Sequence, residues 1–222
     1  MRLWSESFSD GGVIAPQCAF AVIDPATHVR LSGNRNPHLA WDEVPAGTAS
    51  LILFCFDIDA PSVGTDVNQE GRAIASNLAR TDFYHWTLAD IAPSTKSIGE
   101  GALSDAVCAR GKPGPHAALP HASNGAQAMR QGINDYTSWF AGDADMAGDY
   151  YGYDGPCPPW NDTRLHRYLF RIYALDQPRL ELEGKFGGAQ AMAAIRGHIL
   201  DEAQIIGVYT LNPAVAATLG TE

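Results

Sequence analysis

The sequence is poor in basic residues. Its 222 residues contain 15 Lys and Arg against 25 Asp and Glu, which gives a formal net charge of −10 at pH 7. Nucleic acids and anionic membrane surfaces are bound through basic patches that displace counterions, so this balance argues against both as partners. One small anion in a pocket is still compatible with it, because charges more than about 8 Å apart are largely screened at physiological salt.

Long apolar segments are also missing. No uninterrupted apolar run reaches the roughly 18 residues expected of a transmembrane helix. The stretch Met1–Glu6 has none of the apolar core of a secretory signal. We therefore expect a soluble, cytoplasmic protein with no integral membrane segment.

The four cysteines form no recognisable pair. Cys18, Cys55, Cys108 and Cys157 are widely spaced and include no C-x-x-C motif, which argues against a zinc knuckle or a thioredoxin-like site. Reduced thiols are expected in a cytoplasmic protein, although the spacing alone leaves a disulfide open.

Three segments carry the clearest strand patterns. Residues 50–56 form a short, continuously apolar run, which predicts a strand buried on both faces. Residues 83–93 are rich in aromatic and β-branched side chains, and 165–175 reads as a further strand. A chain of 222 residues with no internal repeat is predicted to form one domain, 1–222.

Weaker patterns complete the chain. Short strands are predicted at 16–23 and 208–211, and apolar residues recurring at three- and four-residue spacing predict a helix over 189–203. Between residues 99 and 148 the periodicity is lost in Gly, Pro, Ala, His and Asp. We interpret this stretch as a long excursion with one or two short helical turns at 122–131; loops of such length are usually functional or disordered.

A proline-stiffened loop precedes the strand at 165–175. Proline has no N–H and a restricted φ, so in residues 155–160 (Gly-Pro-Cys-Pro-Pro-Trp) only Gly155, Cys157 and Trp160 have a backbone donor. Side chains alternate along a strand, which places His166 and Tyr168 on one face. The segment is either a structural turn before a half-buried strand or the rim of a binding site.

Two other places bring polar groups to strand ends. Asp57 and Asp59 follow the apolar run and share one strand face, so they either accept hydrogen bonds from loop N–H groups or serve a ligand. His85 is the one side chain of its strand before Asp90 that titrates near neutral pH. A lone strand histidine is more often a hydrogen-bonded core residue than a functional one.

Together these segments resemble the phosphatidylethanolamine-binding protein family, also called Raf kinase inhibitor-like proteins, in its bacterial branch. The match comprises residues 57–61 (Asp-Ile-Asp-Ala-Pro), His85-Trp86, residues 155–159 (Gly-Pro-Cys-Pro-Pro) and residues 166–168 (His-Arg-Tyr). Four motifs in one order are far more specific than any single motif. Two departures stand out: Ile58 occupies the place of the family's first proline, and the 99–148 segment is longer than is usual in the family.

The resemblance implies a mainly β fold, in which a large antiparallel sheet packs on a smaller one with peripheral helices, including one near the C-terminus. It also implies a small anion pocket, lined by the residues that match Asp57, His85, Gly155, His166 and Tyr168. Family members bind phospholipid head groups, act on protein partners such as kinases or proteases, and in bacteria often pair as homodimers. We expect these properties here, without an enzymatic activity, a metal or another cofactor.

The residue types are consistent with such a ligand. His85 and His166 titrate near about 6.5 when unperturbed, Tyr168 offers an O–H, and Gly155 and Cys157 offer backbone N–H groups. The carboxylates of Asp57 and Asp59 would repel a bare phosphate unless they orient a histidine or meet a cation. The predicted ligand-binding set suits a zwitterionic head group or a phosphorylated or carboxylated small molecule; its members are Asp57, Asp59, His85, Gly155, Cys157, His166 and Tyr168.

Two alternatives belong to other classes. A hydrolase acting on a phosphorylated or acylated small molecule would use Ser62 or Cys157 as nucleophile, but the chain has no Gly-x-Ser-x-Gly elbow. A divalent metal held by Asp57, His85 and His166 would be the second, without support from any short ligand spacing.

Overall fold

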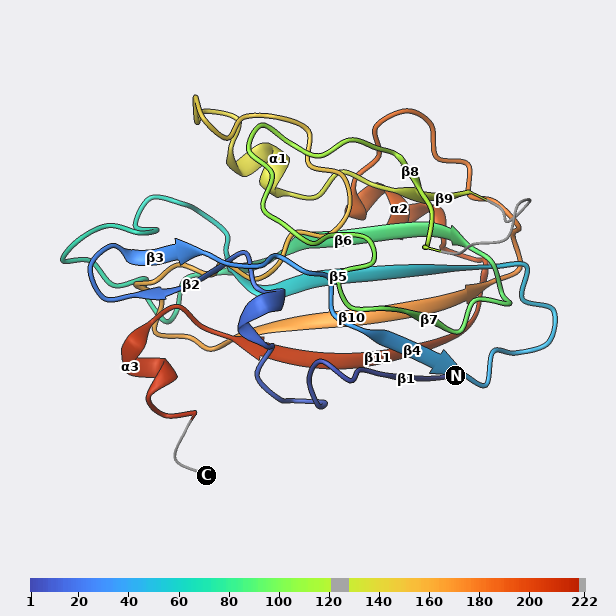
Figure 1. Cartoon of the computed structure of the whole chain (residues 1–222), viewed down its shortest axis with the longest axis horizontal. Coiled ribbons are helices and arrows are strands. Elements are labelled where there is room, and N and C mark those ends of the chain that lie inside the picture. Colours follow the sequence, from blue (N-terminus) through green and yellow to red (C-terminus); the bar gives the residue numbers. More distant parts are fainter. Residues whose placement is uncertain (121–127, 220–222) are drawn as a thin grey trace.

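The centre of the molecule is a six-stranded antiparallel sheet (Figure 1). The computed structural model describes residues 1–120 and 128–219. The strand order is β11-β10-β5-β6-β9-β8. In that order the strands are Ile199–Tyr209, His166–Leu175, Ser50–Pro61, Arg80–Ile91, Met129–Gln131 and His116–Ala117.

Smaller elements surround this sheet. A three-stranded sheet contains β1 (Arg2–Trp4), β4 (Leu39–Asp42) and β7 (Ser97–Ile98), and a hairpin pairs β2 (Ala21–Asp24) with β3 (His28–Leu31). The helical elements are a 3-10 turn at Pro16–Cys18, α1 (Tyr136–Trp139), α2 (Gly188–Ala194) and α3 (Pro213–Ala216). The predicted mainly β fold with peripheral helices is confirmed.

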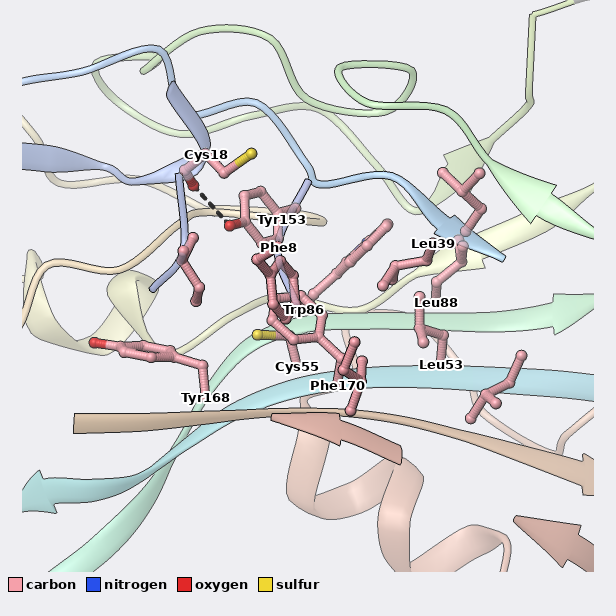
Figure 2. Packing of buried hydrophobic residues seen from close by; sticks show 14 of the residues in the cluster. Phe8, Cys18, Leu39, Leu53, Cys55, Trp86, Leu88, Tyr153, Tyr168 and Phe170 are labelled. Carbon is pink, nitrogen blue, oxygen red and sulfur yellow. Dashed lines mark hydrogen bonds between the residues drawn. The ribbon is translucent and has the colours of Figure 1, made fainter. Parts of the chain in front are cut away.

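The main core lies between the large sheet and the three-stranded sheet. Leu39 of β4 packs in one cluster with Leu53, Trp86 and Phe170 of the three central strands (Figure 2). A second cluster, which includes Phe54 and residues of α2, covers the opposite face. β5 therefore lies between two apolar layers, as its continuous apolar run predicted.

Alternation along β10 assigns its side chains to these two layers. Tyr168, Phe170 and Ile172 belong to the main core, whereas Leu169 and Tyr173 belong to the second cluster. The predicted facing of this strand is confirmed. His166 precedes Tyr168 by two residues, so its side chain lies on the same face, at the first residue of β10.

The predicted helix over 189–203 is wrong in its second half. α2 ends at Ala194, and a turn with Gly197 at a φ of 85° leads into β11. β11 pairs with β10 from Ile199 to Tyr209, and Ile199 is 42% exposed. Ladder hydrogen bonds to a neighbouring strand thus outweigh an apolar spacing that fits a helix by coincidence. The strand predicted at 208–211 is the end of β11, and α3 follows it.

Two shorter predictions also need correction. The strand predicted at 16–23 is a 3-10 turn followed by β2. Of the helical turns predicted at 122–131, residues 122–127 lie outside the described part of the chain, and Met129–Gln131 is the strand β9. β9 pairs with β6 through Leu88 and Gln131. The excursion thus adds strands to the edge of the large sheet, which no local periodicity reveals.

Within the described residues, no helix has both the length and the apolar character that crossing a membrane requires.

Candidate functional site

A cavity of about 280 Å³ lies at one end of the central strands, against the β2–β3 hairpin and the proline-rich loop. β5 contributes Asp57, β6 contributes His85, and β10 contributes His166 and Tyr168 to its wall. Tyr168 is the antiparallel partner of Asp57, which itself faces Phe83 of β6. Strand register therefore brings together side chains that lie far apart in the sequence, such as Asp57 and His166, which are 109 residues apart.

His166 lies between two carboxylates. Its Nδ1 is 2.6 Å from Oδ2 of Asp57, and its Nε2 is 3.1 Å from Oδ2 of Asp162. Burial opposes a charge here, but the hydrogen bonds to Asp162 and Asp57 raise the pKa of His166 to about 9. The ring is therefore an imidazolium at neutral pH with both N–H groups engaged. Direct donation to a ligand would require one of these bonds to break.

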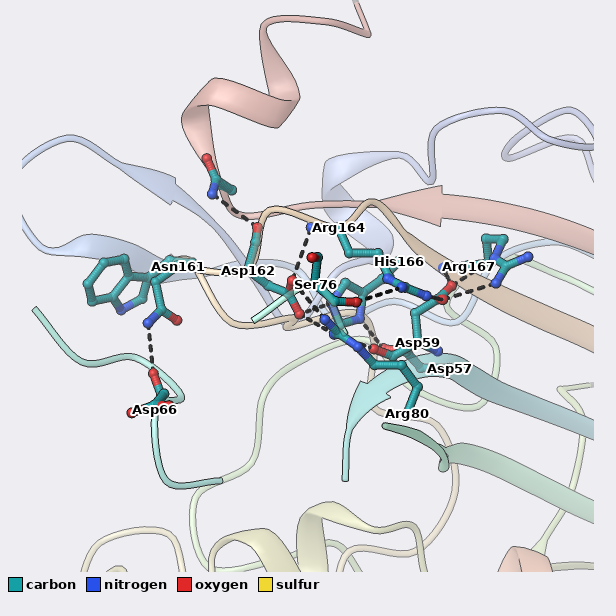
Figure 3. Close-up of polar contacts among 12 residues, drawn as sticks. Asp57, Asp59, Asp66, Ser76, Arg80, Asn161, Asp162, Arg164, His166 and Arg167 are labelled. Atoms are coloured by element: carbon teal, nitrogen blue, oxygen red, sulfur yellow. Dashed lines mark hydrogen bonds and ion pairs between the residues drawn. The ribbon is translucent and has the colours of Figure 1, made fainter. Parts of the chain in front are cut away.

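Arg80 completes the charge balance of this cluster (Figure 3). Its guanidinium contacts both carboxylate oxygens of Asp162, and its Nη1 donates to the backbone carbonyl of Asp59 at 2.9 Å. Burial would raise the pKa of Asp162, but hydrogen bonds from His166, Arg80 and the N–H of Arg164 lower it to about 2. The sequence signalled neither Arg80 nor Asp162, because their significance depends entirely on distant partners.

Asp59 faces away from the cavity. Arg167 binds its carboxylate through Nε at 2.8 Å and Nη2 at 3.0 Å, and Arg164 lies 3.2 Å from Oδ1. Burial alone would raise the pKa of Asp59, but these cations hold it below its ordinary value. Asp57 and Asp59 are thus separated in role: Asp57 borders the cavity, whereas Asp59 fixes the start of β10 to the end of β5.

One ring nitrogen of His85, at the cavity wall, has no hydrogen-bond partner among the described residues. Its Nδ1 lies 2.8 Å from the backbone carbonyl of Asp154, an acceptor, so Nδ1 carries the proton and Nε2 is bare in the neutral ring. Burial lowers the pKa of His85, and the nearby Asp57 offsets this only in part. The rings of Tyr136 and Tyr168 pack edge-on against it. His85 is therefore a neutral acceptor that can become a donor by taking up a proton.

The Tyr168 hydroxyl is buried without a hydrogen-bond partner among the described residues. Figure 2 shows its ring at the edge of the core cluster, with the hydroxyl directed away from Phe170 and Trp86. A buried hydroxyl that lacks a partner is destabilising unless water or a ligand supplies one. Because Tyr168 borders the cavity, it is the clearest vacant donor of the site.

The proline-rich loop forms one rim, and its donors differ in availability. Cys157, Pro158 and Pro159 border the cavity. Gly155 lies behind it: its N–H donates to Oδ1 of Asn34 at 2.8 Å. A side chain at Gly155 would collide with the backbone of Cys18, which explains the glycine. The N–H of Gly155 is thus committed to the fold rather than free for a ligand as predicted.

Behind His85, a buried carboxylate joins three segments of the chain. Asp154 accepts hydrogen bonds from the side-chain amides of Asn34 and Asn134, each at 2.7 Å, and pairs with Nζ of Lys112 at 3.0 Å. Lys112 belongs to the long excursion. The same residue whose carbonyl orients His85 is therefore held in place by the excursion and the N-terminal loop.

The opposite wall is aromatic and was not predicted. Phe20, Tyr136, Trp139 and Phe140 border the cavity, and the last three belong to α1 and its C-terminal end. Their spacing of three and four residues within the excursion is the sequence signal that could have identified them. Asn68 and the apolar residues Val29 and Leu31 extend the wall towards the surface.

Within the described residues, no group of three or more His, Cys, Asp or Glu side chains is arranged to hold a metal ion. Two of the three residues proposed for a metal also have hydrogen-bond partners within the protein that limit them as ligands. His166 bonds to carboxylates through both nitrogens, and the Nδ1 of His85 faces a carbonyl.

Comparison with known proteins agrees with this architecture. A family model described as phosphatidylethanolamine-binding protein matches residues 4–210. A UPF0098 protein of Methanothermobacter thermautotrophicus is 30% identical over 209 residues, which cover 94% of this chain and 98% of the relative. The UPF0098 protein YbhB of Escherichia coli is 28% identical over 177 residues, which cover 80% and 82%.

Solved structures show the same fold. The crystal structure of E. coli YbcL, described as a new member of the mammalian PEBP family, superposes with a TM-score of 0.63 at 22% identity, covering 94% of this chain and 97% of the other. A phosphatidylethanolamine-binding protein homolog of Chlamydia trachomatis gives a TM-score of 0.60 at 24% identity, covering 94% and 95%. Since the family model spans nearly the whole chain, the protein belongs to the phosphatidylethanolamine-binding protein family.

Proposed function

We propose that the protein is a non-enzymatic binding protein for a small molecule with a phosphorylated or carboxylated head group. The observation that carries this proposal is the buried hydroxyl of Tyr168, which has no hydrogen-bond partner within residues 1–120 and 128–219; Tyr168 borders the cavity next to His85. An anionic oxygen placed between these two side chains would accept a hydrogen bond from Tyr168 and stabilise a proton on Nε2 of His85. Both interactions are charge-assisted and therefore stronger than neutral hydrogen bonds.

The charges of Asp57 and His166 beside the cavity are compatible with a bound anionic head group. Asp57 accepts the N–H of Asp59 on Oδ1 at 2.7 Å and faces His166 on Oδ2, so both of its oxygens have partners. The imidazolium of His166 offsets the carboxylate that would otherwise repel an anion. A zwitterionic head group such as phosphoethanolamine is also compatible with this site, because the carboxylate of Asp57 borders the cavity.

The hydrolase alternative lacks comparable support. Ser62 is exposed and lies outside the cavity wall. Cys157 borders the cavity, but burial raises the pKa of its thiol to about 12, which leaves little thiolate at neutral pH.

Titration calorimetry with inorganic phosphate and with phosphoethanolamine tests the proposal. Tyr168→Phe and His85→Ala should each weaken binding by about 1.5–3 kcal/mol, the usual worth of a hydrogen bond to a charged group. Tyr173→Phe is the matched control, because Tyr173 belongs to the same strand but to the opposite apolar layer. Unchanged affinity in both cavity variants would refute the assignment.

Three expectations remain part of the proposal: action on protein partners such as kinases or proteases, pairing as a homodimer, and a cytoplasmic location. Native mass spectrometry of protein purified without added phosphate would report bound ligand and subunit number together. A strictly monomeric spectrum across micromolar concentrations would remove the homodimer.

A further inference from the structure

The aromatic wall of the cavity is a continuous stack. The rings of Phe20 and Tyr136 stack at a centroid distance of 4.8 Å, and Tyr136 stacks on Phe140 at 5.4 Å. Phe83 meets Tyr136 edge-on at 5.3 Å. Phe20, Phe83, Tyr136 and Phe140 are each held by a neighbouring ring, so this part of the wall is pre-shaped and a ligand need not order it on binding.

This wall reaches the surface through two exposed apolar side chains. Trp139 is 50% exposed and Leu31 is 57% exposed, and both border the cavity. They come from different elements, α1 and β3, which both border the cavity. Exposed large apolar groups gathered at the edge of a cavity are typical of a ligand-binding surface.

The polar groups that face the cavity lie at its inner end. Asp57, His85, His166 and Tyr168 are each 3% exposed or less, whereas the outer wall is aliphatic and aromatic apart from Asn68. A ligand with its charged end at Tyr168 would therefore place whatever is bonded to that end against Tyr136, Phe140 and Trp139. A bare inorganic anion would leave this apolar surface in contact with water.

We propose that this wall is a subsite for an aryl or short alkyl group attached to the head group, so that the ligand is a small monoester or carboxylic acid with one apolar substituent. This inference rests on the proposed function and adds the substrate class. The cavity of about 280 Å³ lies at the lower limit of the roughly 300–1,000 Å³ of drug-sized sites. It has room for a head group and one ring or short chain, not for two long acyl chains.

Much of this subsite belongs to the long excursion, because α1 lies within residues 99–148. Asp135, just before α1, is anchored to β6, because its Oδ2 accepts the N–H of Tyr84 at 2.7 Å. The Tyr136 hydroxyl donates to the carbonyl of Gly155 at 2.9 Å, which joins α1 to the proline-rich rim. The segment between residues 99 and 148 thus supplies, through α1, much of the surface that would contact the apolar part of the ligand.

A ligand series with matched variants tests the inference at pH 7. Inorganic phosphate, phenyl phosphate and hexyl phosphate are titrated into the wild-type protein and into Trp139→Ala, Trp139→Phe and Trp4→Ala. Trp4 is the matched control, because it is a comparably exposed tryptophan on β1, outside the cavity wall. Far-UV circular dichroism and thermal melting verify that each variant is folded.

We expect phenyl and hexyl phosphate to bind about ten-fold or more tightly than inorganic phosphate, because each buries apolar area against the wall. In Trp139→Ala, the affinity for phenyl and hexyl phosphate should fall several-fold, whereas the affinity for inorganic phosphate should not change. Trp139→Phe should retain most of the gain, and Trp4→Ala all of it.

Each other outcome overturns the inference, and the outcomes differ in what they mean for the proposed function. Equal affinity for all three compounds removes the subsite but keeps the head-group site. If none of the three compounds binds, both the subsite and the head-group site are refuted. If phosphatidylethanolamine vesicles bind and Trp139→Ala reduces only that binding, the exposed side chains contact a lipid surface instead of a single small ligand.

Discussion

Nδ1 of His166 lies 2.6 Å from a carboxylate oxygen of Asp57, although the two residues are 109 positions apart in the sequence. The contact joins the start of β10 to β5 at the inner end of the cavity. Asp162 closes the other side of the ring, so His166 carries its charge between two carboxylates. The cavity therefore has one histidine that is held charged and one, His85, that burial keeps neutral.

Anion binding is expected to take up a proton at His85. Burial lowers the pKa of His85 below 6.5 in the free protein, and a bound anion would raise it. Affinity should therefore increase as the pH falls from 8, and level off below the free-protein pKa of His85. Phenyl sulfate is a suitable probe, because its ester group does not titrate in this range.

Titration calorimetry in two buffers that differ in protonation enthalpy would measure the number of protons taken up when the anion binds. His85→Gln should lose the pH dependence, whereas His116→Gln, an exposed histidine of β8, should keep it. A pH-independent affinity in the wild-type protein would contradict the role given to His85.

Asp162→Asn should lower stability most at neutral and mildly acidic pH. The pKa of His166 is raised from 6.5 to about 9, so its stabilising charge is complete below pH 6.5 and is lost as the pH rises through 9. The pKa of Asp162 is lowered from 3.8 to about 2, so its contribution is present above pH 3.8 and is lost as the pH falls through 2. Removing one partner of such a buried cluster costs about 3 kcal/mol or more.

Urea unfolding at pH 6 and at pH 9.5 would measure this, with a smaller difference from wild type expected at pH 9.5. Asp66→Asn serves as the control, because its pair with Arg72 at 2.7 Å is exposed and is worth about 1 kcal/mol or less. Equal losses in the two variants would show that the Asp162 cluster contributes no more than a surface ion pair.

Lys112→Met should be strongly destabilising. Its ammonium lies 3.0 Å from the fully buried carboxylate of Asp154, which would be left with only its two amide partners. The expected loss is about 3 kcal/mol in the free energy of unfolding. Lys185→Met removes an exposed pair with Asp149 and should cost little, because solvent screens such a pair. A loss no greater than that of Lys185→Met would mean that the excursion is not anchored through Lys112.

Cys157 should react slowly with iodoacetamide at pH 7. The residue borders the cavity and is partly exposed, so the reagent can approach it, but its thiol has a pKa raised by burial to about 12. Cys108, a partly exposed thiol outside the cavity wall, is the internal reference for peptide mapping by mass spectrometry. If Cys157 is labelled faster than Cys108, its thiol is activated, and this result would support the alternative that the protein is a hydrolase.

Much of the cavity could be predicted because its motifs are local and ordered. The apolar run before Asp57 and the alternation through His166 and Tyr168 place these side chains at strand ends without knowledge of their neighbours. The separation of Asp59 from Asp57 could not be predicted. Both follow the same run, and only the positions of Arg164 and Arg167 draw Asp59 out of the cavity wall.

The sequence by itself determined the mainly β architecture, the buried central strand and the convergence of the polar motifs, since these follow from side-chain period and from a resemblance that spans the chain. The tertiary structure alone decided which donors are free. Gly155 donates to Asn34, His166 is enclosed by two carboxylates, and the hydroxyl of Tyr168 has no hydrogen-bond partner in the described part of the chain. It also decided that α1 forms a wall of the cavity. Hydrogen bonds and ion pairs depend on distances of a few ångströms between distant segments, and local periodicity contains no information about those distances.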